Sequence, residues 1–186
     1  MKKKLLPILL IAVTTTAFSQ IQFDLTESTA KWSGKKITNQ VHSGSLKFSS
    51  ASLSLENLNK PDGVFTVDMT SLTNEDLTGE YKQKLEGHLK SEDFFSVDKH
   101  PKATLVIKKV NSHNINSYEL TGDLTIKDIT HSVNFNLIVY KDRVESKLTF
   151  DRSKYDIQFA SGSFFENLGD NLILDDITLD ITLQKI

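Results

Sequence analysis

The sequence predicts an all-β protein: an antiparallel β-barrel of about eight strands, with one short α-helix covering an opening. Three observations predict it. Apolar and polar residues alternate along most of the chain, the connections between alternating segments are short, and a single stretch has helical spacing. An antiparallel sheet with one apolar face can close as a two-sheet sandwich or as a barrel. We favour the barrel, because a helix across one opening would bury its own apolar stripe there.

The period-two alternation is clearest near the C-terminus, where Ile177, Leu179 and Ile181 alternate with Thr178 and Asp180. The same period recurs in residues 30–36, 65–70, 103–108, 118–127, 133–139 and 148–150. The phase slips at residues 49–51, which indicates either a tight turn or a β-bulge. Turn signals at 60–63 and 141–142 separate neighbouring strands.

The helical stretch covers residues 77–89. Apolar residues stand four apart in it and predict a stripe along one side: Leu77, Tyr81, Leu85 and Leu89. It is followed by a connector that carries two adjacent phenylalanines, Phe94 and Phe95, and ends at Pro101.

The first nineteen residues have the features of a cleaved secretory signal peptide. Lysines at positions 2–4 precede an apolar run over residues 5–13, and Ala17-Phe18-Ser19 supplies a cleavage site after Ser19. The run is well short of the roughly 20 residues that a transmembrane helix needs. We therefore expect residues 1–19 to be removed, leaving one domain over residues 20–186, without a membrane span, that is periplasmic or secreted. Because the chain has no cysteine, a lipid-anchored lipoprotein is excluded.

The charge of the chain argues against nucleic acid as a partner. Losing the three lysines of the signal peptide takes the formal net charge from −2 to −5. Affinity for nucleic acid comes largely from Lys and Arg that neutralise phosphates, and this chain has an acidic balance.

The residues that usually carry catalysis or hold metals have no recognisable spacing. No HExxH, Gly-x-Ser-x-Gly or phosphate-binding glycine loop is present, and the neighbouring carboxylates Asp175 and Asp176 would point to opposite faces of a strand. We therefore expect no enzyme activity and no metal site. The five histidines are interpreted as structural residues: His42, His88, His100, His113 and His131.

The predicted interior is apolar. An eight-stranded barrel has the size at which side chains either fill the interior or leave room for one small ligand, and residue pattern alone does not decide between the two. A lipid-facing barrel of the outer-membrane kind is disfavoured, because aromatic residues do not gather at strand ends as girdles and the chain ends in Gln184-Lys185-Ile186.

Four motifs follow one another over essentially all of the chain after residue 20: AKWSGKKITNQVHSGSLKF, LEGHLKSEDFFSVDKHPKATLVIKKV, YELTGDLTIKDITHSVNFNL and FDRSKYDIQFASGSFFENLGDNLILDDITLDITL. In type and order these motifs resemble those of the YceI-like family. One departure precedes His88-Leu89, where many members carry an Arg-Asp pair and this chain has Lys84-Leu85-Glu86-Gly87.

The resemblance implies a lipocalin-like, exported barrel with an elongated apolar tunnel. Members of the family have been associated with polyisoprenoid lipids, meaning quinones and prenyl phosphates. The implied function is binding of such an apolar lipid for transport, storage or sequestration, with a bound isoprenoid quinone or polyprenyl lipid in place of a cofactor. A ligand-free stress-related or interaction module on the same barrel is the alternative, and a homodimer is left open.

Strand parity, the helical stripe and the phenylalanine pairs predict the residues that would line the cavity. These are Trp32, Phe48, Phe65, Val67, Leu85, Leu89, Phe94, Phe95, Leu105, Ile107, Leu120, Leu124, Phe135, Leu137, Phe150, Phe164, Leu179 and Ile181.

Two interpretations are open for Phe94 and Phe95. One ring would plug the barrel end while the other packs on the helix or faces the opening, or both rings would simply pin the helix to the barrel.

Overall fold

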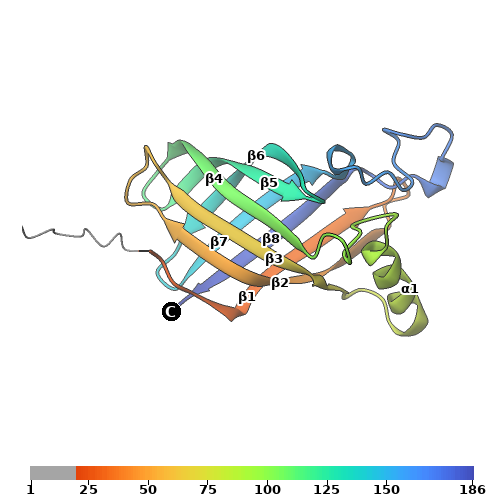
Figure 1. The fold of residues 1–186 in the computed structure, drawn as a ribbon, viewed down its shortest axis with the longest axis horizontal. Coiled ribbons are helices and arrows are strands. Elements are labelled where there is room, and N and C mark those ends of the chain that lie inside the picture. Colours follow the sequence, from red (N-terminus) through yellow and green to blue (C-terminus); the bar gives the residue numbers. More distant parts are fainter. Residues whose placement is uncertain (1–19) are drawn as a thin grey trace, which may run out of the picture.

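A computed structural model describes residues 20–186 and shows a closed antiparallel barrel (Figure 1). The predicted signal peptide, residues 1–19, lies outside the described residues. Each strand pairs with the next along the chain, and the last pairs with the first, so the barrel prediction is confirmed over the sandwich. The strands are β1 (Phe23–Lys35), β2 (Val41–Ser54), β3 (Asp62–Asn74), β4 (Lys102–His113), β5 (Ser117–Ile126), β6 (Ile129–Val139), β7 (Arg143–Asp151) and β8 (Asp176–Lys185).

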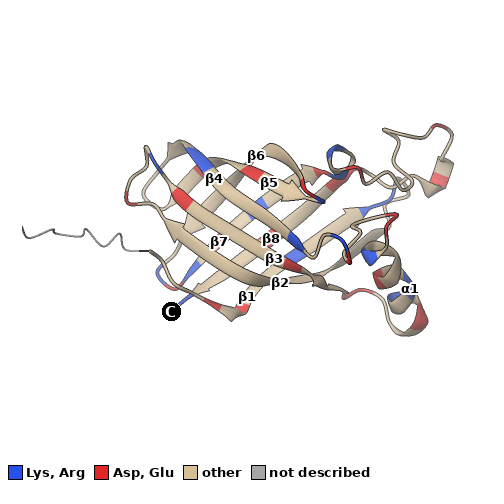
Figure 2. Cartoon of the chain, in the orientation of Figure 1, with Lys and Arg blue, Asp and Glu red and all other residues tan. Residues whose placement is uncertain are grey.

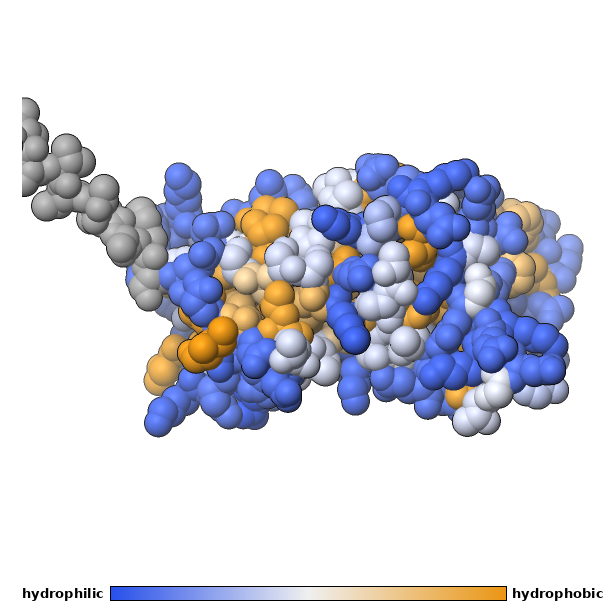
Figure 3. Space-filling view, turned by 60° about the horizontal axis from the view of Figure 1, so that its bottom comes forward, coloured by the Kyte–Doolittle hydropathy of each residue, from blue (hydrophilic) through white to orange (hydrophobic). Residues whose placement is uncertain are grey.

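The alternation places apolar side chains inside the barrel. In β5, Leu120, Leu124 and Ile126 are buried, while Thr121 and Thr125 between them are only partly covered. The outer wall is mostly hydrophilic on the face shown in Figure 3, although apolar patches interrupt it. This is the reverse of a lipid-facing barrel, whose apolar residues point outward.

Local irregularities account for the features that break the alternation. The phase slip at residues 49–51 is a β-bulge, since the register between β2 and β3 shifts between Phe48 and Ser50. β5 turns into β6 through Lys127 and Asp128, which both have positive φ (50° and 61°). Two successive residues of this kind form the tight turn whose twist matches that of an antiparallel hairpin.

The helix, α1 (Gly79–Lys90), begins two residues later than the sequence predicts. The predicted stripe is wrong at Tyr81, whose side chain is 75% exposed, and Leu77 precedes the helix. Positions four apart drift by about 40° at each step around a helix of 3.6 residues per turn. The inner face is therefore formed by Leu85, His88 and Leu89, which line the barrel interior.

One end of the barrel, here called the mouth, is formed by α1, residues 91–101 and residues 156–175 (Figure 1). The 91–101 segment folds back on the helix, because the backbone N–H groups of Phe95 and Val97 donate to the carbonyls of Leu89 and Lys90. Short 3₁₀ turns precede and interrupt the second loop, at Arg152–Tyr155 and Gly169–Asn171. Both ends of the described chain lie at the opposite end of the barrel.

Charged residues lie on the outer wall and at the barrel ends rather than in the middle of the interior (Figure 2). Within residues 20–186, no helix is both long enough and apolar enough to cross a membrane.

Candidate functional site

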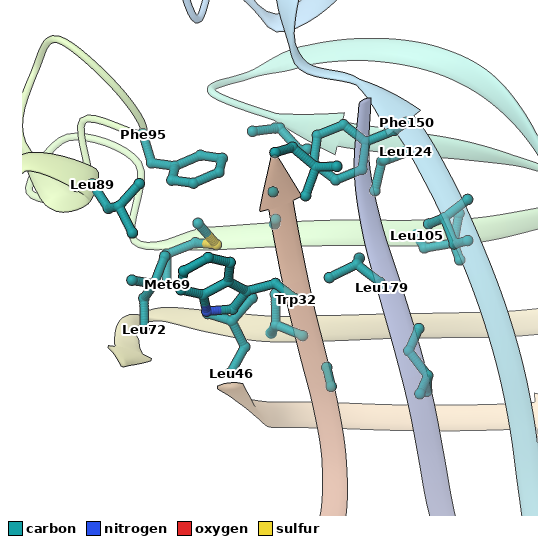
Figure 4. Close-up of a pocket in the computed structure, with 18 of the residues that line it drawn as sticks. Trp32, Leu46, Met69, Leu72, Leu89, Phe95, Leu105, Leu124, Phe150 and Leu179 are labelled. Atoms are coloured by element: carbon teal, nitrogen blue, oxygen red, sulfur yellow. The ribbon is translucent and has the colours of Figure 1, made fainter. Parts of the chain in front are cut away.

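The barrel contains a cavity of about 310 Å³ that reaches the mouth. All eight strands contribute to its wall, and α1 and the two mouth loops contribute to its rim. Its volume is at the lower end of the range for small-molecule sites, and its lining is overwhelmingly apolar. Figure 4 shows side chains from separate strands pointing into one space, with Phe95 and Leu89 at the helix end and Leu105 deeper in the barrel.

Fifteen of the eighteen predicted lining residues do line this cavity: Trp32, Phe48, Phe65, Val67, Leu85, Leu89, Phe94, Phe95, Leu105, Leu124, Phe135, Leu137, Phe150, Leu179 and Ile181. Strand parity placed most of them, because side chains on alternate residues of a strand point to the same face.

Ile107 and Leu120 point inward as predicted but do not line the cavity. Both are buried where the barrel is filled. A side chain added at Gly63 would come within 2.5 Å of Ile107 Cδ1 and 3.4 Å of Leu53 Cδ1, so these two residues meet over the glycine. The alternation along a strand predicts whether a side chain points into the barrel. It does not predict how tightly the barrel is packed at that level.

The prediction for Phe164 is also wrong. Its side chain is 43% exposed and does not line the cavity. It lies in the 156–175 loop, which forms a 3₁₀ turn and irregular backbone at this end of the barrel, so strand parity does not apply to it.

Trp32 lines the cavity and is held in place by its neighbours. Its indole Nε1 donates to the carbonyl of Thr73 at 3.0 Å. Its strand partner is Gly44, where an added Cβ would come within 2.8 Å of the indole and 1.8 Å of the Thr73 oxygen. Gly44 therefore leaves room for the indole and for the close approach of β3, and Figure 4 shows the Trp32 ring among the other side chains that line the cavity.

Phe94 and Phe95 serve both of the roles that the sequence left open. Both rings are buried, both line the cavity, and they contact each other edge to face with centroids 5.0 Å apart. Phe94 also packs against His88 on α1, at 5.8 Å, and lies 5.4 Å from the guanidinium of Arg152. The pair therefore closes part of the mouth and fixes the helix to it.

A family model for the YceI-like domain matches residues 19–185. The chain belongs to this family. No functionally curated protein matches it.

Solved structures of similar proteins share the fold of this YceI-like domain. BcnA of Burkholderia cenocepacia is 20% identical with a TM-score of 0.70, over 88% of this chain and 99% of its own. A polyisoprenoid-binding domain from Saccharophagus degradans, implicated in plant cell wall breakdown, is 12% identical with a TM-score of 0.60, over 91% and 98%. The YceI protein of Campylobacter jejuni is 15% identical with a TM-score of 0.55, over 100% and 99%.

Arg152 supports the mouth of this YceI-like domain, and sequence analysis did not single it out. Its side chain is 0% exposed. The guanidinium donates to the carbonyls of Ile157, Phe159 and Ile173 at 2.9–3.1 Å and forms an ion pair with Asp175 at 3.2 Å. Burial lowers the pKa of Arg152 from its ordinary value, while the nearby carboxylates act in the opposite direction.

Asp175 extends this support to the rest of the loop. Its second carboxylate oxygen accepts hydrogen bonds from the hydroxyls of Ser161, at 2.9 Å, and Ser163, at 2.7 Å. Arg152 and Asp175 together therefore fix residues 157–175 as one unit over the barrel end. Only the order of residues in the fourth family motif could have pointed to this pair, because Arg152 and Asp175 are far apart in sequence and most of their partners are backbone carbonyls or serine hydroxyls, which carry no distinctive sequence signal.

Asn74 has the corresponding role beneath the helix. It is fully buried, donates from Nδ2 to the carbonyl of Ser43 and accepts at Oδ1 from the backbone N–H of Leu77, both at 2.9 Å. Its own backbone N–H donates to Glu86 on α1 at 2.8 Å. The strand end, the helix start and the helix middle are thereby tied together.

Asp76 completes the Asn74 network. Its carboxylate accepts from the backbone N–H of Ser43 and lies 2.7 Å from His42 Nδ1. Partial burial raises the pKa of Asp76, but the hydrogen bonds from Ser43, His42 and Asn74 outweigh it, so that the pKa is lowered from its ordinary value.

Nine apolar lining residues were absent from the prediction although they follow the strand alternation: Ala30, Leu46, Met69, Ala103, Ile126, Val144, Leu148, Ile177 and Leu183. Leu72 also lines the cavity but breaks the alternation of β3, whose register with β2 is irregular there, and Phe159 and Ile173 line it from the mouth loop.

The polar lining residues are few. They are Lys35, Lys36, His42, His88, Thr104 and Ser146. His88 could have been found from its spacing, three residues after Leu85 and next to Leu89 on the inner face of α1. Across residues 20–186, no three or more His, Cys, Asp or Glu residues gather closely enough to hold a metal ion.

Proposed function

We propose that this YceI-like protein is an exported lipid-binding protein. It holds an isoprenoid-type lipid, a quinone or a polyprenyl derivative, in the barrel cavity for transport, storage or sequestration. The observation that carries the proposal is the apolar cavity of about 310 Å³, which is open at the mouth and filled by no side chain.

The physical basis is the transfer of a hydrocarbon chain out of water. Burying apolar surface stabilises a complex by about 25 cal/mol per Å². A tail held in this way needs shape and dispersion contacts rather than many polar groups, which fits a wall built from Leu, Ile, Val, Phe and Trp32. Membership of the YceI-like family and the likeness to a polyisoprenoid-binding domain support an isoprenoid tail over other hydrocarbons.

The proposed location follows from the first nineteen residues. Their signal-peptide pattern supports a mature domain in the periplasm or outside the cell, where a lipid that crosses an aqueous space needs a protein to cover its tail.

Native mass spectrometry of the protein purified from its own cell envelope tests the proposal. We expect an additional mass of several hundred daltons that is lost on organic extraction and is identified as an isoprenoid lipid. A clean apo mass, together with no uptake of added lipid, would contradict the proposal and favour a ligand-free interaction module.

Trp32 provides a second measurement, because it is the single tryptophan of the chain and lines the cavity. We expect a quinone with an isoprenoid tail to quench its fluorescence in a saturable manner. Free N-acetyltryptophanamide at matched absorbance corrects for light absorbed by the quinone. A linear, unsaturable decrease equal to that of the free indole would argue against binding beside Trp32.

A further inference from the structure

Three buried polar atoms of the mouth have no hydrogen bond within residues 20–186, and two of them, His100 Nδ1 and Asp175 Oδ1, are in ion pairs with Asp128 and Arg152. The third is on His88. His88 lines the cavity from the inner face of α1, and its Nε2 is buried without a hydrogen bond to any residue in 20–186. The ring instead contacts two phenylalanines edge to face, Phe94 at 5.8 Å and Phe159 at 4.2 Å between centroids. Contacts of this kind are weak substitutes for a hydrogen bond.

An unpaired buried nitrogen is unusual because buried polar groups nearly always have partners. Packing does not explain it, since a phenylalanine or leucine would fill the same position without an unsatisfied atom. The neighbouring buried polar groups, Arg152 and Asn74, are fully engaged with carbonyls and backbone N–H groups. His88 therefore differs from its surroundings in having hydrogen-bonding capacity that the fold does not use.

Access to His88 depends on Phe159. The Phe159 ring lies against the imidazole and also lines the cavity, yet it is 44% exposed. Its backbone is anchored by Arg152, which donates to its carbonyl, so the side chain can rotate toward solvent while the loop stays in place. Such a rotation would uncover Nε2 to a molecule in the mouth.

Two cations complete the polar part of the rim. Lys35, at the end of β1, and Lys36, which follows it, line the cavity, and no ion pair or hydrogen bond of their ammonium groups is found within residues 20–186. Asp76 and Asp175 are already paired, with His42 and Arg152 respectively. The ammonium groups of Lys35 and Lys36 are therefore available to a ligand in the mouth.

We propose that the mouth is a headgroup site in which His88 Nε2 and the ammonium of Lys36 bind an acceptor oxygen of the lipid, while its apolar tail lies along Trp32. The inference rests on the proposed function and narrows it. The ligand class is a tailed lipid with an oxygen acceptor at its head, such as a quinone carbonyl or a phosphate, and a bare hydrocarbon is a poor ligand. Lysine is a pure donor and carries positive charge, so it favours the phosphate.

The test uses three ligands with the same farnesyl tail and different heads: farnesyl phosphate, a ubiquinone with a farnesyl tail, and the headless hydrocarbon farnesane. Delipidated protein is titrated with each and bound fractions are measured by native mass spectrometry. In the wild type we expect both headed ligands to bind at least tenfold more tightly than farnesane.

Four variants measure separately what His88 and Lys36 contribute to headgroup binding. His88→Phe keeps the ring contacts and removes the nitrogen, and should weaken both headed ligands about tenfold while leaving farnesane unchanged. His88→Gln restores a hydrogen-bonding group and should recover part of the loss. Lys36→Met should weaken farnesyl phosphate more than the quinone and leave farnesane unchanged, and Lys31→Met, on the exposed face of β1 outside the cavity, serves as its matched control.

The outcomes separate this inference from the proposed function. Equal wild-type affinity for all three ligands would overturn the headgroup site and leave lipid binding intact, whatever the variants do. If His88→Phe weakened the binding of all three ligands equally, His88 would contribute only to the shape of the cavity and not to headgroup binding. Binding of none of the three by the wild type would count against the proposed function itself.

Discussion

The barrel interior is packed in one part and hollow in another, although the strands alternate in the same way in both. Leu53, Ile107 and Leu120 are buried and do not reach the cavity. Leu105 and Leu124, on the same strands as Ile107 and Leu120 but closer to the mouth, line it. Similar residues on one face of one sheet thus have opposite roles, because Ile107 meets Leu53 over Gly63 whereas Leu105 and Leu124 border the cavity.

Small residues mark the hollow part. Ala30, Gly34 and Ala103 all contribute to the cavity wall. Gly63, in the packed part, leaves no cavity, because the side chains of Ile107 and Leu53 occupy the space over it. A cavity therefore requires small wall positions that no large side chain from across the barrel fills.

The largest expected effect concerns the support of the hollow part at its mouth. Arg152→Met removes the ion-pair partner of Asp175 and the donor to four carbonyls, and we expect the free energy of unfolding to fall by about 3–5 kcal/mol. Arg143→Met is the matched control: Arg143 pairs with Glu145 on the surface, and its loss should cost less than about 1 kcal/mol. Urea denaturation measures both. Similar losses in the two variants would contradict the role given to Arg152.

The second prediction compares the two parts directly. Leu120→Ala opens a void in a filled region and should cost about 2–5 kcal/mol, without changing lipid uptake. Leu105→Ala removes a side chain that already borders a void, so it should cost less than about 2 kcal/mol while altering uptake. Equal destabilisation by the two substitutions would mean that the cavity is not hollow in solution.

Filling the cavity should separate binding from stability. Ala103 lines the hollow part, so the series Ala103→Val, Ala103→Leu and Ala103→Phe should reduce lipid uptake progressively, by tenfold or more for phenylalanine. Thermal unfolding should change little, because the added atoms enter free space; in a filled core the same change costs about 1–3 kcal/mol. A steep loss of stability along the series would show that the space is already occupied.

The smallest effect at neutral pH is expected for Tyr155, which is buried outside the cavity. Its hydroxyl has no hydrogen-bond partner within residues 20–186, and burial raises its pKa from 10.0 to about 12. The unfolded chain therefore loses this proton first as the pH rises. The contribution of the protonated Tyr155 hydroxyl to the free energy of unfolding is fully present below pH 10. It declines between pH 10 and 12, by up to about 2.7 kcal/mol.

Tyr155→Phe should abolish this alkaline loss and change the free energy of unfolding by less than about 1 kcal/mol at pH 7. The measurement is the wild type minus variant difference at pH 7, 10 and 11.5, which cancels the titration of exposed groups. A constant difference across this range would mean that the hydroxyl is hydrated in the folded protein.

The sequence was sufficient to predict the barrel and the inward faces of its strands, because alternation is a local property of two or three residues. It was insufficient for Ile107 and Leu120, whose environment depends on Gly63, Leu53 and other residues far along the chain. For the same reason the choice between a packed and a hollow interior stayed open until the residues that face each other across the barrel were known.

The mouth was the least predictable region. Arg152 and Asn74 form hydrogen bonds with groups that only the folded loops bring near them. Their partners therefore cannot be predicted from residue spacing. Tyr81 was misplaced because a four-residue repeat drifts around a helix. Phe164 was misplaced because it lies on irregular backbone, where alternate side chains do not point to opposite faces as they do in a strand.

Both ends of the described chain lie opposite the mouth (Figure 1). Ile21 bridges to Leu53 and the backbone N–H of Ile186 donates to Gln22, so the two ends leave the barrel side by side. An affinity tag, a fluorescent fusion or a sensor-chip linkage at either terminus would consequently orient every molecule with its opening toward the bulk solution. Immobilised protein can thus be offered vesicles or lipid micelles without steric interference from its own attachment.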